Sequence, residues 1–350
     1  MVASSTLTNI LSKAAQLGAS DVHIHAGAKL RIRVNGELLE KGDKPIPAQA
    51  TTALIHSILN AEQMARLEQC GQVDLSLSVE GVGRCRCNAY RQQRGLDAVF
   101  RLISETPPSL SDLNLPAHLE SLTEYRNGLV LVTGPAGSGK TSTIAALLSI
   151  INEKRRDHII TIEDPIEYLH PSKGCLVNQR QVGLHTGGFA PALRAALRED
   201  PDVMMIGELR DLDSISLAVT AAETGHLVFA TLHTRSSIES INRLINVFPI
   251  EDQPQVRSQL SGTLRAVITQ RLLMTTDRSQ RIPALEILMV NPAVRGLILD
   301  NKTHLIISTQ QLKRDGMCTL DQSLAELVRT RRVTSEEAAR FVTEPQALMR

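Results

Sequence analysis

One short segment of the sequence has the residue types and spacing that hold phosphate groups. Residues 134–141 read Gly-Pro-Ala-Gly-Ser-Gly-Lys-Thr, which matches the pattern G-x-x-x-x-G-K-[ST]. The segment follows an apolar run and precedes a predicted helix over residues 142–152. Glycines in such a loop let backbone N–H groups turn towards phosphate oxygens, and the N-terminus of the helix adds positive potential. The sequence therefore predicts a nucleoside triphosphate site.

The side chains of this loop have separate expected roles. Lys140 would reach the β- and γ-phosphates, and the Thr141 hydroxyl would ligate Mg²⁺. We expect the whole loop and the first helical residue to contact the nucleotide. The expected binding residues are Gly134, Pro135, Ala136, Gly137, Ser138, Gly139, Lys140, Thr141 and Ser142.

Two later apolar runs end in carboxylates. The run 158–163 ends in Glu163, followed by Asp164, and the run 203–206 is followed by Gly207 and Glu208. Ligands bind beyond the carboxyl ends of parallel strands, so both glutamates are expected beside the phosphate loop. Many phosphate-loop enzymes have an Asp where this chain has Gly207. We expect Glu208 to polarise the attacking water and Glu163 to support the metal ion, directly or through a water. The alternative, that one of these acids only caps the surface, stays open.

Two histidines flank the apolar run 227–232. His233 follows the run and should lie at the same rim as the phosphate loop, whereas His226 precedes it. A neutral imidazole at that rim could sense the γ-phosphate or link subunits. A single histidine in such a place is more often structural, and both interpretations stay open.

A basic hairpin is predicted near the end of the first hundred residues. Residues 81–101 contain five Arg and one acid, Asp97. Strand alternation puts Arg86 on the polar face of one strand and Arg101 on the polar face of the next. The face is either solvated or binds an anion, and phosphate is the obvious anion beside a nucleotide site.

The elements that must position these residues fall into two predicted domains. Residues 1–104 alternate short amphipathic strands with helices, at 6–17 and 48–67, and so predict a mixed α/β domain. Residues 105–118 contain three Pro and predict a linker. From residue 119, continuous apolar runs separated by helical stretches predict a mostly parallel sheet covered on both faces. The chain is predicted to be mostly helical from about residue 283.

Composition argues against several classes of function. Lys plus Arg number 38 and Asp plus Glu 37, so charge gives no reason to expect a nucleic acid partner. Aromatic residues make up 2% of the chain, which leaves few stacking platforms for single strands. The five Cys are odd in number and lack C-x-x-C spacing, so we predict neither a disulfide framework nor a zinc site. Without a signal peptide or a long apolar run, we expect a cytoplasmic protein that does not insert into a membrane.

Four motifs together resemble those of a known family. The phosphate loop, "TIEDPIEY", "LRAALREDPDVMMIGELRD" and "TAAETGHLVFATLHT" resemble, in order, the Walker A, Asp-box, Walker B and His-box motifs of type II/type IV secretion superfamily ATPases. Within it, nearly the whole chain is similar to the PilT-type ATPases of type IV pilus retraction (twitching motility). The resemblance implies ATP and Mg²⁺ as cofactors, a PAS-like N-terminal domain and a RecA-like P-loop ATPase domain. It also implies a homo-hexamer that acts, peripherally to the inner membrane, on a pilus platform protein.

The resemblance further implies roles for individual residues. Glu208 matches the catalytic Glu of an atypical Walker B motif, and Glu163 matches the acid of the Asp box. Arg86 and Arg101 match the arginines of the N-terminal domain that reach the γ-phosphate. The His-box pair is His226 and His233.

Two observations bear on which member of the family the chain resembles. We expect neither the extra N-terminal domain nor the four-Cys zinc insert of assembly and type II secretion relatives, which favours the retraction type. The retraction signature Ala-Ile-Arg-Asn-Leu-Ile-Arg-Glu is altered here over residues 293–300, where Gly296 and Leu299 depart from it. The alternatives are an accessory or regulatory paralogue with weak turnover, acting beside a related retraction or assembly ATPase, or a pilus assembly or type II secretion ATPase. A nucleic-acid motor of the same core fold is a further alternative that charge and aromatic content disfavour.

Overall fold

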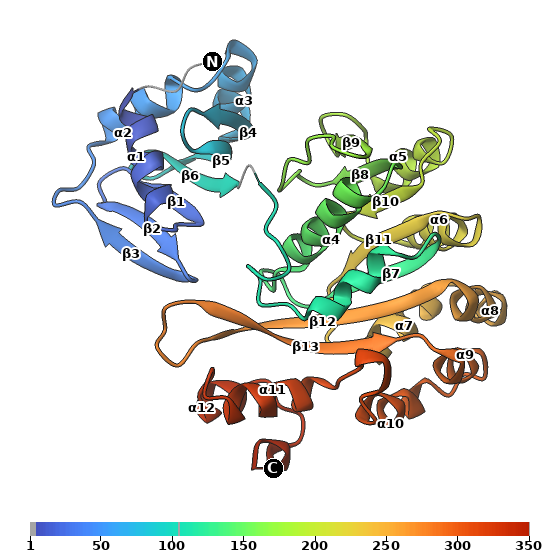
Figure 1. Ribbon diagram of the computed structural model, residues 1–350. Helices are drawn as coiled ribbons and strands as arrows, with labels where there is room; N and C mark the ends of the chain where they lie inside the picture. Colours follow the sequence, from blue (N-terminus) through green and yellow to red (C-terminus); the bar gives the residue numbers. More distant parts are fainter. Residues whose placement is uncertain (1–4, 104–105, 350) are drawn as a thin grey trace. The chain divides into compact units, whose positions relative to one another are not determined.

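Figure 1 shows the computed structural model of the chain, which describes residues 5–103 and 106–349. The chain divides into two compact units, with the boundary between Thr106 and Pro107. The end of the first domain predicted at residue 104 lies outside the described residues. One sheet is antiparallel and the other is mostly parallel, which confirms the predicted mixed α/β class.

Among residues 5–103, the first unit is a six-stranded antiparallel sheet with helices packed against one face. The strand order is β3-β2-β1-β6-β5-β4. Apolar side chains such as Leu11, Ile55 and Phe100 are buried between the helices and the sheet. The side chains of Arg86 and Arg101 project from the other face of the sheet. The elements are α1 (Ser5–Gln16), β1 (Asp21–Ile24), β2 (Leu30–Val34), β3 (Glu37–Lys41), α2 (Ala48–His56), α3 (Ala61–Cys70), β4 (Gln72–Val79), β5 (Gly83–Gln92) and β6 (Gly95–Ile103).

The predicted single helix over residues 48–67 is wrong, because α2 and α3 are separate helices. Asn60 begins α3 with a capping box: its side chain accepts from the backbone N–H of Gln63, and the Gln63 side chain accepts from the backbone N–H of Asn60. Such a cap stabilises a helix start and interrupts the apolar periodicity that suggested one long helix.

Among residues 107–349, the second unit contains a seven-stranded sheet of order β13-β12-β7-β11-β10-β8-β9. The strands that the apolar runs predicted, β7, β8, β10 and β11, are parallel to one another. The strands are β7 (Gly128–Thr133), β8 (His158–Glu163), β9 (Leu176–Gln181), β10 (Val203–Ile206), β11 (Leu227–Leu232), β12 (Leu264–Met274) and β13 (Arg281–Met289).

Helices cover both faces of this sheet, as the continuous apolar runs predicted. One face packs against η1 and α4, and the other against α5 to α9. In β7, Leu129 and Leu131 belong to one core and Val130 and Val132 to the other. The helices are η1 (Ala117–Thr123), α4 (Lys140–Lys154), α5 (Phe189–Ala196), α6 (Leu212–Glu223), α7 (Ser237–Asn246), α8 (Gln253–Thr263), α9 (Pro292–Leu299), η2 (Thr303–Leu305), α10 (Ile306–Gln311), η3 (Arg314–Gly316), α11 (Leu320–Arg329), α12 (Ser335–Ala338) and η4 (Pro345–Met349).

The helical region begins later than the predicted residue 283. Residues 281–289 form β13, which pairs antiparallel with β12 along its full length. A short apolar run is compatible with either a helix or a buried strand, and the long pairing with β12 selects the strand. In addition, Leu110 and Leu115 of the predicted linker are buried in the core of the second unit. No helix formed by the described residues is long and apolar enough to cross a membrane.

Candidate nucleotide site

The loop between β7 and α4 is shaped by its glycines. Gly134, Gly137 and Gly139 have φ angles of 139°, 73° and 88°, in the region that side chains disfavour. A Cβ on Gly134 would also lie 2.5 Å from the carbonyl oxygen of Gln270 on β12. Crowding and φ together require glycine at Gly134, and positive φ favours it at Gly137 and Gly139. This is the geometry that turns backbone N–H groups towards a phosphate.

Lys140 closes this loop from inside. Its ammonium donates to the carbonyl oxygens of Gly134 and Pro135, both at 2.9 Å, and the side chain is buried. Burial lowers the pKa of Lys140, while the carboxylates of Glu208 and Glu167 act in the raising direction. The cation thus lies within the electrostatic reach of both acids.

Two buried polar atoms under the loop lack a hydrogen-bond partner among the described residues. They are Ser138 Oγ and Gln270 Oε1, and the Gln270 amide nitrogen lies 3.4 Å from the Ser138 carbonyl oxygen. Unpaired buried polar groups are costly and concentrate at functional sites. Together with the glycine geometry and Lys140, they fit a loop that receives an anionic ligand.

The start of α4 is tied to the loop that follows β8. Ser142 Oγ lies 2.8 Å from the Tyr168 hydroxyl. Thr141 lies one residue earlier, on the first turn of α4, where its hydroxyl is suited to a Mg²⁺ ligand. Over residues 5–103 and 106–349, no group of three or more His, Cys, Asp or Glu side chains could hold a metal. A Mg²⁺ ion here would therefore depend on phosphate oxygens and waters for most of its ligands, which is usual for this ion.

Glu163, at the end of β8, is a buried carboxylate held by uncharged donors. Its Oε1 accepts from the Thr161 hydroxyl at 2.6 Å and from the Gln179 amide at 3.1 Å, and its Oε2 accepts from the backbone N–H of Glu167 at 3.3 Å. Burial raises the pKa of Glu163, and these hydrogen bonds oppose the rise. The carboxylate is therefore fixed in position by neutral neighbours.

Glu208, just after β10, is a carboxylate held by an arginine and a histidine. Its Oε2 accepts from Arg210 Nε at 2.7 Å, and its Oε1 lies 3.3 Å from His233 Nε2. The hydrogen bond to Glu208 raises the pKa of Arg210, with a smaller contribution from Asp164. The structure thus brings Glu208 and His233 together, as the sequence predicted for two residues at one rim of the sheet. Lys140 lies within electrostatic reach of the Glu208 carboxylate.

Gly207 lets β8 and β10 end side by side. Its N–H donates to the Ile162 carbonyl oxygen at 2.8 Å. A Cβ at this position would lie 3.2 Å from the same oxygen, and 3.4 Å from both Glu163 Cα and the Phe189 ring. The crowding gives a physical reason for glycine at position 207, because any Cβ would press on β8 and on the Phe189 ring.

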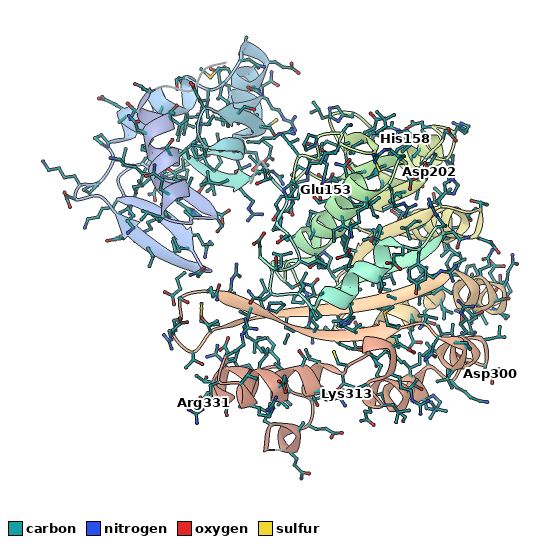
Figure 2. All side chains as sticks on the ribbon, in the orientation of Figure 1. Glu153, His158, Asp202, Asp300, Lys313 and Arg331 are labelled. Carbon is teal, nitrogen blue, oxygen red and sulfur yellow. The ribbon has the colours of Figure 1, made fainter. Side chains whose placement is uncertain are left out.

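His226 precedes β11 and His233 follows it, so the two histidines lie at opposite ends of this strand. Its Nδ1 lies 2.9 Å from the carbonyl oxygen of Ala221 in α6. The next residue donates its N–H to the carbonyl oxygen of Asp202, and Asp202 in turn accepts from the backbone N–H of His158. Figure 2 labels His158 and Asp202, which mark the end of the sheet at which His226 lies. Six residues of β11 separate the two histidines, roughly 20 Å of strand, so this chain alone does not bring His226 to the phosphate loop.

Arg86 and Arg101 lie in the first unit, directly opposite each other in the β5–β6 register. Arg101 Nε donates to Asp21 Oδ1 at 2.9 Å, and Arg86 lies 3.6 Å from Asp74. The predicted polar face is therefore present, and both guanidinium groups are on it.

Sequence reasoning missed several residues that surround these side chains. Arg210 and Glu167 lie within the motifs "GELRD" and "EDPIEY", so their spacing from the two acids could have identified them. The partners Gln179, Gln270 and Asp21 come from distant segments, and no local pattern points to them.

Comparisons with known proteins cover both units. The family described as "Type II/IV secretion system protein" matches residues 2–340. The Pseudomonas aeruginosa type IV pilus retraction ATPase PilT is 44% identical over 341 residues, which are 97% of this chain and 99% of that protein. A Neisseria gonorrhoeae twitching motility protein is 46% identical over 318 residues, 91% of this chain and 85% of that protein. The crystal structure of the pilus retraction motor PilT with bound ADP has a TM-score of 0.88 at 42% identity and covers 98% of both chains.

Proposed function

This chain belongs to the type II/IV secretion system protein family and is an ATPase, and we propose that it is a hexameric motor whose ATP hydrolysis powers type IV pilus retraction, or twitching motility. One observation carries the proposal: 44% identity to a type IV pilus retraction ATPase over 97% of the chain. The intact phosphate loop, with its three left-handed glycines and buried Lys140, supports the chemistry.

ATP binding falls to the loop between β7 and α4. Its backbone N–H groups surround the phosphates, and Lys140 moves from the two loop carbonyl oxygens to the β- and γ-phosphates. Thr141 would hold Mg²⁺, and the ion would supply positive charge to the phosphate oxygens. Glu163, whose oxygens accept hydrogen bonds from neutral donors, would support the ion through a water.

Hydrolysis is assigned to Glu208, whose carboxylate orients and polarises the attacking water. Arg210 and His233 hold that carboxylate from two sides, so it is fixed in position. His233 also lies where it can respond to the γ-phosphate. The family resemblance assigns Arg86 and Arg101 to supplying positive charge to a γ-phosphate. His226 is assigned a role only where a neighbouring subunit brings a site to its end of β11.

We assign the other partners from the similarity to the pilus retraction ATPases. A homo-hexamer would transmit the motion of the ATPase units to an inner-membrane pilus platform protein, with the ring on the cytoplasmic side. A related retraction or assembly ATPase is a further partner to test. Near-neutral charge gives no reason to add a nucleic acid.

Phosphate release at steady state tests the enzymatic part. The wild-type chain should hydrolyse ATP well above a Lys140→Ala variant, and equal rates would reject the motor. Deletion in the source organism tests the biological part. Piliated cells that do not twitch support retraction, whereas bald cells indicate pilus assembly instead.

The second candidate is an accessory paralogue, favoured by residues 293–300. These residues form most of α9, where Leu299 is exposed and a Cβ on Gly296 would meet no atom within 4 Å. The departures from the retraction signature therefore alter a surface and not a core. If they weaken a partner contact, the double change Gly296→Asn and Leu299→Arg should increase twitching without changing ATP turnover. An unchanged twitching rate would reject this candidate.

A further inference from the structure

Two buried side chains of opposite charge lie on β12 and β13, the long antiparallel pair of strands in Figure 1. They are Arg271 and Glu286, which are 9% and 7% exposed. Arg271 is opposite Ala284 and Thr269 is opposite Glu286, so the two charged residues are diagonal neighbours on one face of the sheet. Buried charges are costly unless polar groups satisfy them, so the contacts of each one indicate what it does.

Both charges contact one short segment, residues 233–237, which joins β11 to α7. Arg271 Nη2 donates to the Arg235 carbonyl oxygen at 3.1 Å. Glu286 Oε1 accepts from the Ser237 backbone N–H at 3.0 Å and from the Ser237 hydroxyl. Ser237 is the first residue of α7, where a negative charge also interacts favourably with the helix dipole. The cation thus holds a carbonyl oxygen of the segment, and the anion holds two of its donors.

The same pair is connected to the phosphate loop and to α10. Arg271 Nη1 donates at 3.0 Å to the Gln270 carbonyl oxygen, the atom that a Cβ on Gly134 would strike. Glu286 Oε1 also accepts from the Gln310 amide of α10 at 3.4 Å. Burial lowers the pKa of Arg271, and the Glu286 carboxylate opposes the fall, so each charge lies within electrostatic reach of the other.

Other hydrogen bonds of the segment stay within it and the first turn of α7. They join Thr234 to Ser240 at 2.6 Å, and Arg235 and Ser236 to Glu239 at 2.7 and 3.1 Å. These bonds make the segment and the start of α7 a single piece. Among the described residues, the side-chain hydrogen bonds that attach this piece to the sheet are those of the buried pair on β12 and β13.

His233 is the first residue of this segment, and its Nε2 lies 3.3 Å from Glu208 Oε1. The imidazole is 47% exposed, so packing does little to fix it. Its place beside Glu208 therefore depends on the backbone of residues 233–237, which is fixed by β11 at one end and by the contacts of Ser237 at the other. A displacement of about 1 Å at a catalytic group is enough to lower a rate considerably.

We propose that Glu286 is a positioning residue for ATP hydrolysis, which holds residues 233–237 so that His233 meets the Glu208 carboxylate. Arg271 supports the same segment from β12. The proposal rests on the proposed function, in which Glu208 polarises the attacking water. Loss of orientation raises the barrier of the chemical step more than it weakens substrate binding, so the effect should appear in kcat.

Steady-state ATPase kinetics of the full-length Glu286→Gln variant tests the proposal. This change keeps the shape and removes the charge. We expect kcat to fall on the order of tenfold with KM changed less than about twofold. In a His233→Ala background the same change should lower kcat by less than about twofold further, because the two residues act through one contact. Additive losses, or wild-type kcat in either single variant, would overturn the proposal.

Stability measurements separate positioning from a structural role. Urea unfolding should show the same loss of midpoint for Glu286→Gln in both backgrounds, although the losses in kcat are not additive. Thr303→Val is the matched control, because it removes a hydrogen bond of 3.0 Å that ties the other part of α7, at Asn242, to η2. It should lower the urea midpoint and keep wild-type kcat. If it lowers kcat as far as Glu286→Gln does, activity follows the anchoring of α7 as a whole, and the proposal fails.

Ser237→Ala tests the proposal even if Glu286→Gln does not fold. It removes the hydroxyl donor and keeps the backbone N–H, so kcat should fall about threefold, again without a further loss in the His233→Ala background. Full activity of Ser237→Ala would overturn the proposal. If wild type does not exceed Lys140→Ala, the proposed function itself fails, which is a distinct result.

Discussion

The ends of β8 and β10 carry the two glutamates of the site in opposite environments. Glu163 is buried and receives hydrogen bonds from a hydroxyl, an amide and a backbone N–H. Glu208 is partly exposed and contacts Arg210 and His233, with Lys140 within electrostatic reach. The strands are adjacent and parallel, and Gly207 allows their ends to meet.

The two environments show that the position of a carboxylate at the rim of the sheet does not by itself determine its role. A partly exposed carboxylate held by an arginine and a histidine is placed to polarise a water or respond to a phosphate. A carboxylate fixed by neutral donors in a buried position is better suited to hold geometry, including that of a metal-bound water. Glu208 is therefore assigned to chemistry and Glu163 to positioning, and the predictions below test that division.

The largest effect should come from Glu208→Ala. Removal of the group that orients and polarises the water should lower ATP turnover by about 10²–10⁴-fold. The contacts that Glu208 makes with Arg210 and His233 are partly exposed, so the free energy of unfolding should change by less than about 1 kcal/mol. Phosphate release and urea unfolding measure the two quantities, and equilibrium binding of ATP should persist. Retained hydrolysis would move the catalytic role to Glu163.

Glu163→Ala should lower stability more, and ATP turnover less, than Glu208→Ala does. The change leaves the Thr161 hydroxyl and the Gln179 amide buried without their acceptor, which should lower the free energy of unfolding by about 1–3 kcal/mol. Turnover should fall less than in Glu208→Ala. The same two assays decide, and a Glu163→Ala protein with wild-type stability would remove the distinction between the two acids.

Local pattern was sufficient for the parts of the site that lie within one motif. The spacing of glycines and Lys140 predicted the phosphate loop, and apolar runs followed by acids predicted that Glu208 and His233 share a rim. In the first unit, alternation predicted that Arg86 and Arg101 lie on one face, and the register makes them direct neighbours. The loop has a fixed motif spacing, and the alternation in the first unit has the period of the strands that it predicts.

The parts that could not be predicted depend on pairing between distant segments. Asp21 and Arg101 are 80 positions apart, and only the β1–β6 register brings them together. The sequence predicts a helical region where β13 forms, because the apolar residues of this segment fit a helix or a strand equally well. Only pairing with β12 selects the strand. The separation of His226 from His233 follows from the direction of β11, and no spacing rule states which end of a strand a ligand needs.

Gly207→Ala should disturb the strand ends that carry Glu163 and Glu208 at the same time. The added Cβ would lie 3.2 Å from the Ile162 carbonyl oxygen and 3.4 Å from Glu163 Cα, so β8 must move by a few tenths of an ångström. We expect a loss of about 1 kcal/mol in the free energy of unfolding. Chemical denaturation measures it, and Gly187→Ala, where a Cβ would meet no atom within 4 Å, is the matched control. Equal stability of the two variants would show that Gly207 is not required by crowding.

The smallest effect concerns the pH dependence of stability through Glu163. Burial raises the pKa of this carboxyl above its ordinary value of 4.5, so the folded state binds the proton more tightly than the unfolded state. Its contribution to stability is therefore fully present below pH 4.5 and is lost as the pH rises through the higher, folded pKa. Glu163→Gln keeps the shape and removes the titration. The free energy of unfolding of the wild type, minus that of Glu163→Gln, should therefore decrease from about pH 4 to about pH 7.

A carboxylate in the same unit gives the opposite sign and serves as the control. Glu326 on α11 accepts from Arg329, and this hydrogen bond lowers its pKa. Its contribution is present above its ordinary pKa and is lost as the pH falls, so the difference between wild type and Glu326→Gln should rise with pH. The rise should be small because the pair is exposed. If the Glu163 difference also rose with pH, the carboxylate would be stabilised in its ionised form. The division of roles between the two strand ends would then lose its physical basis.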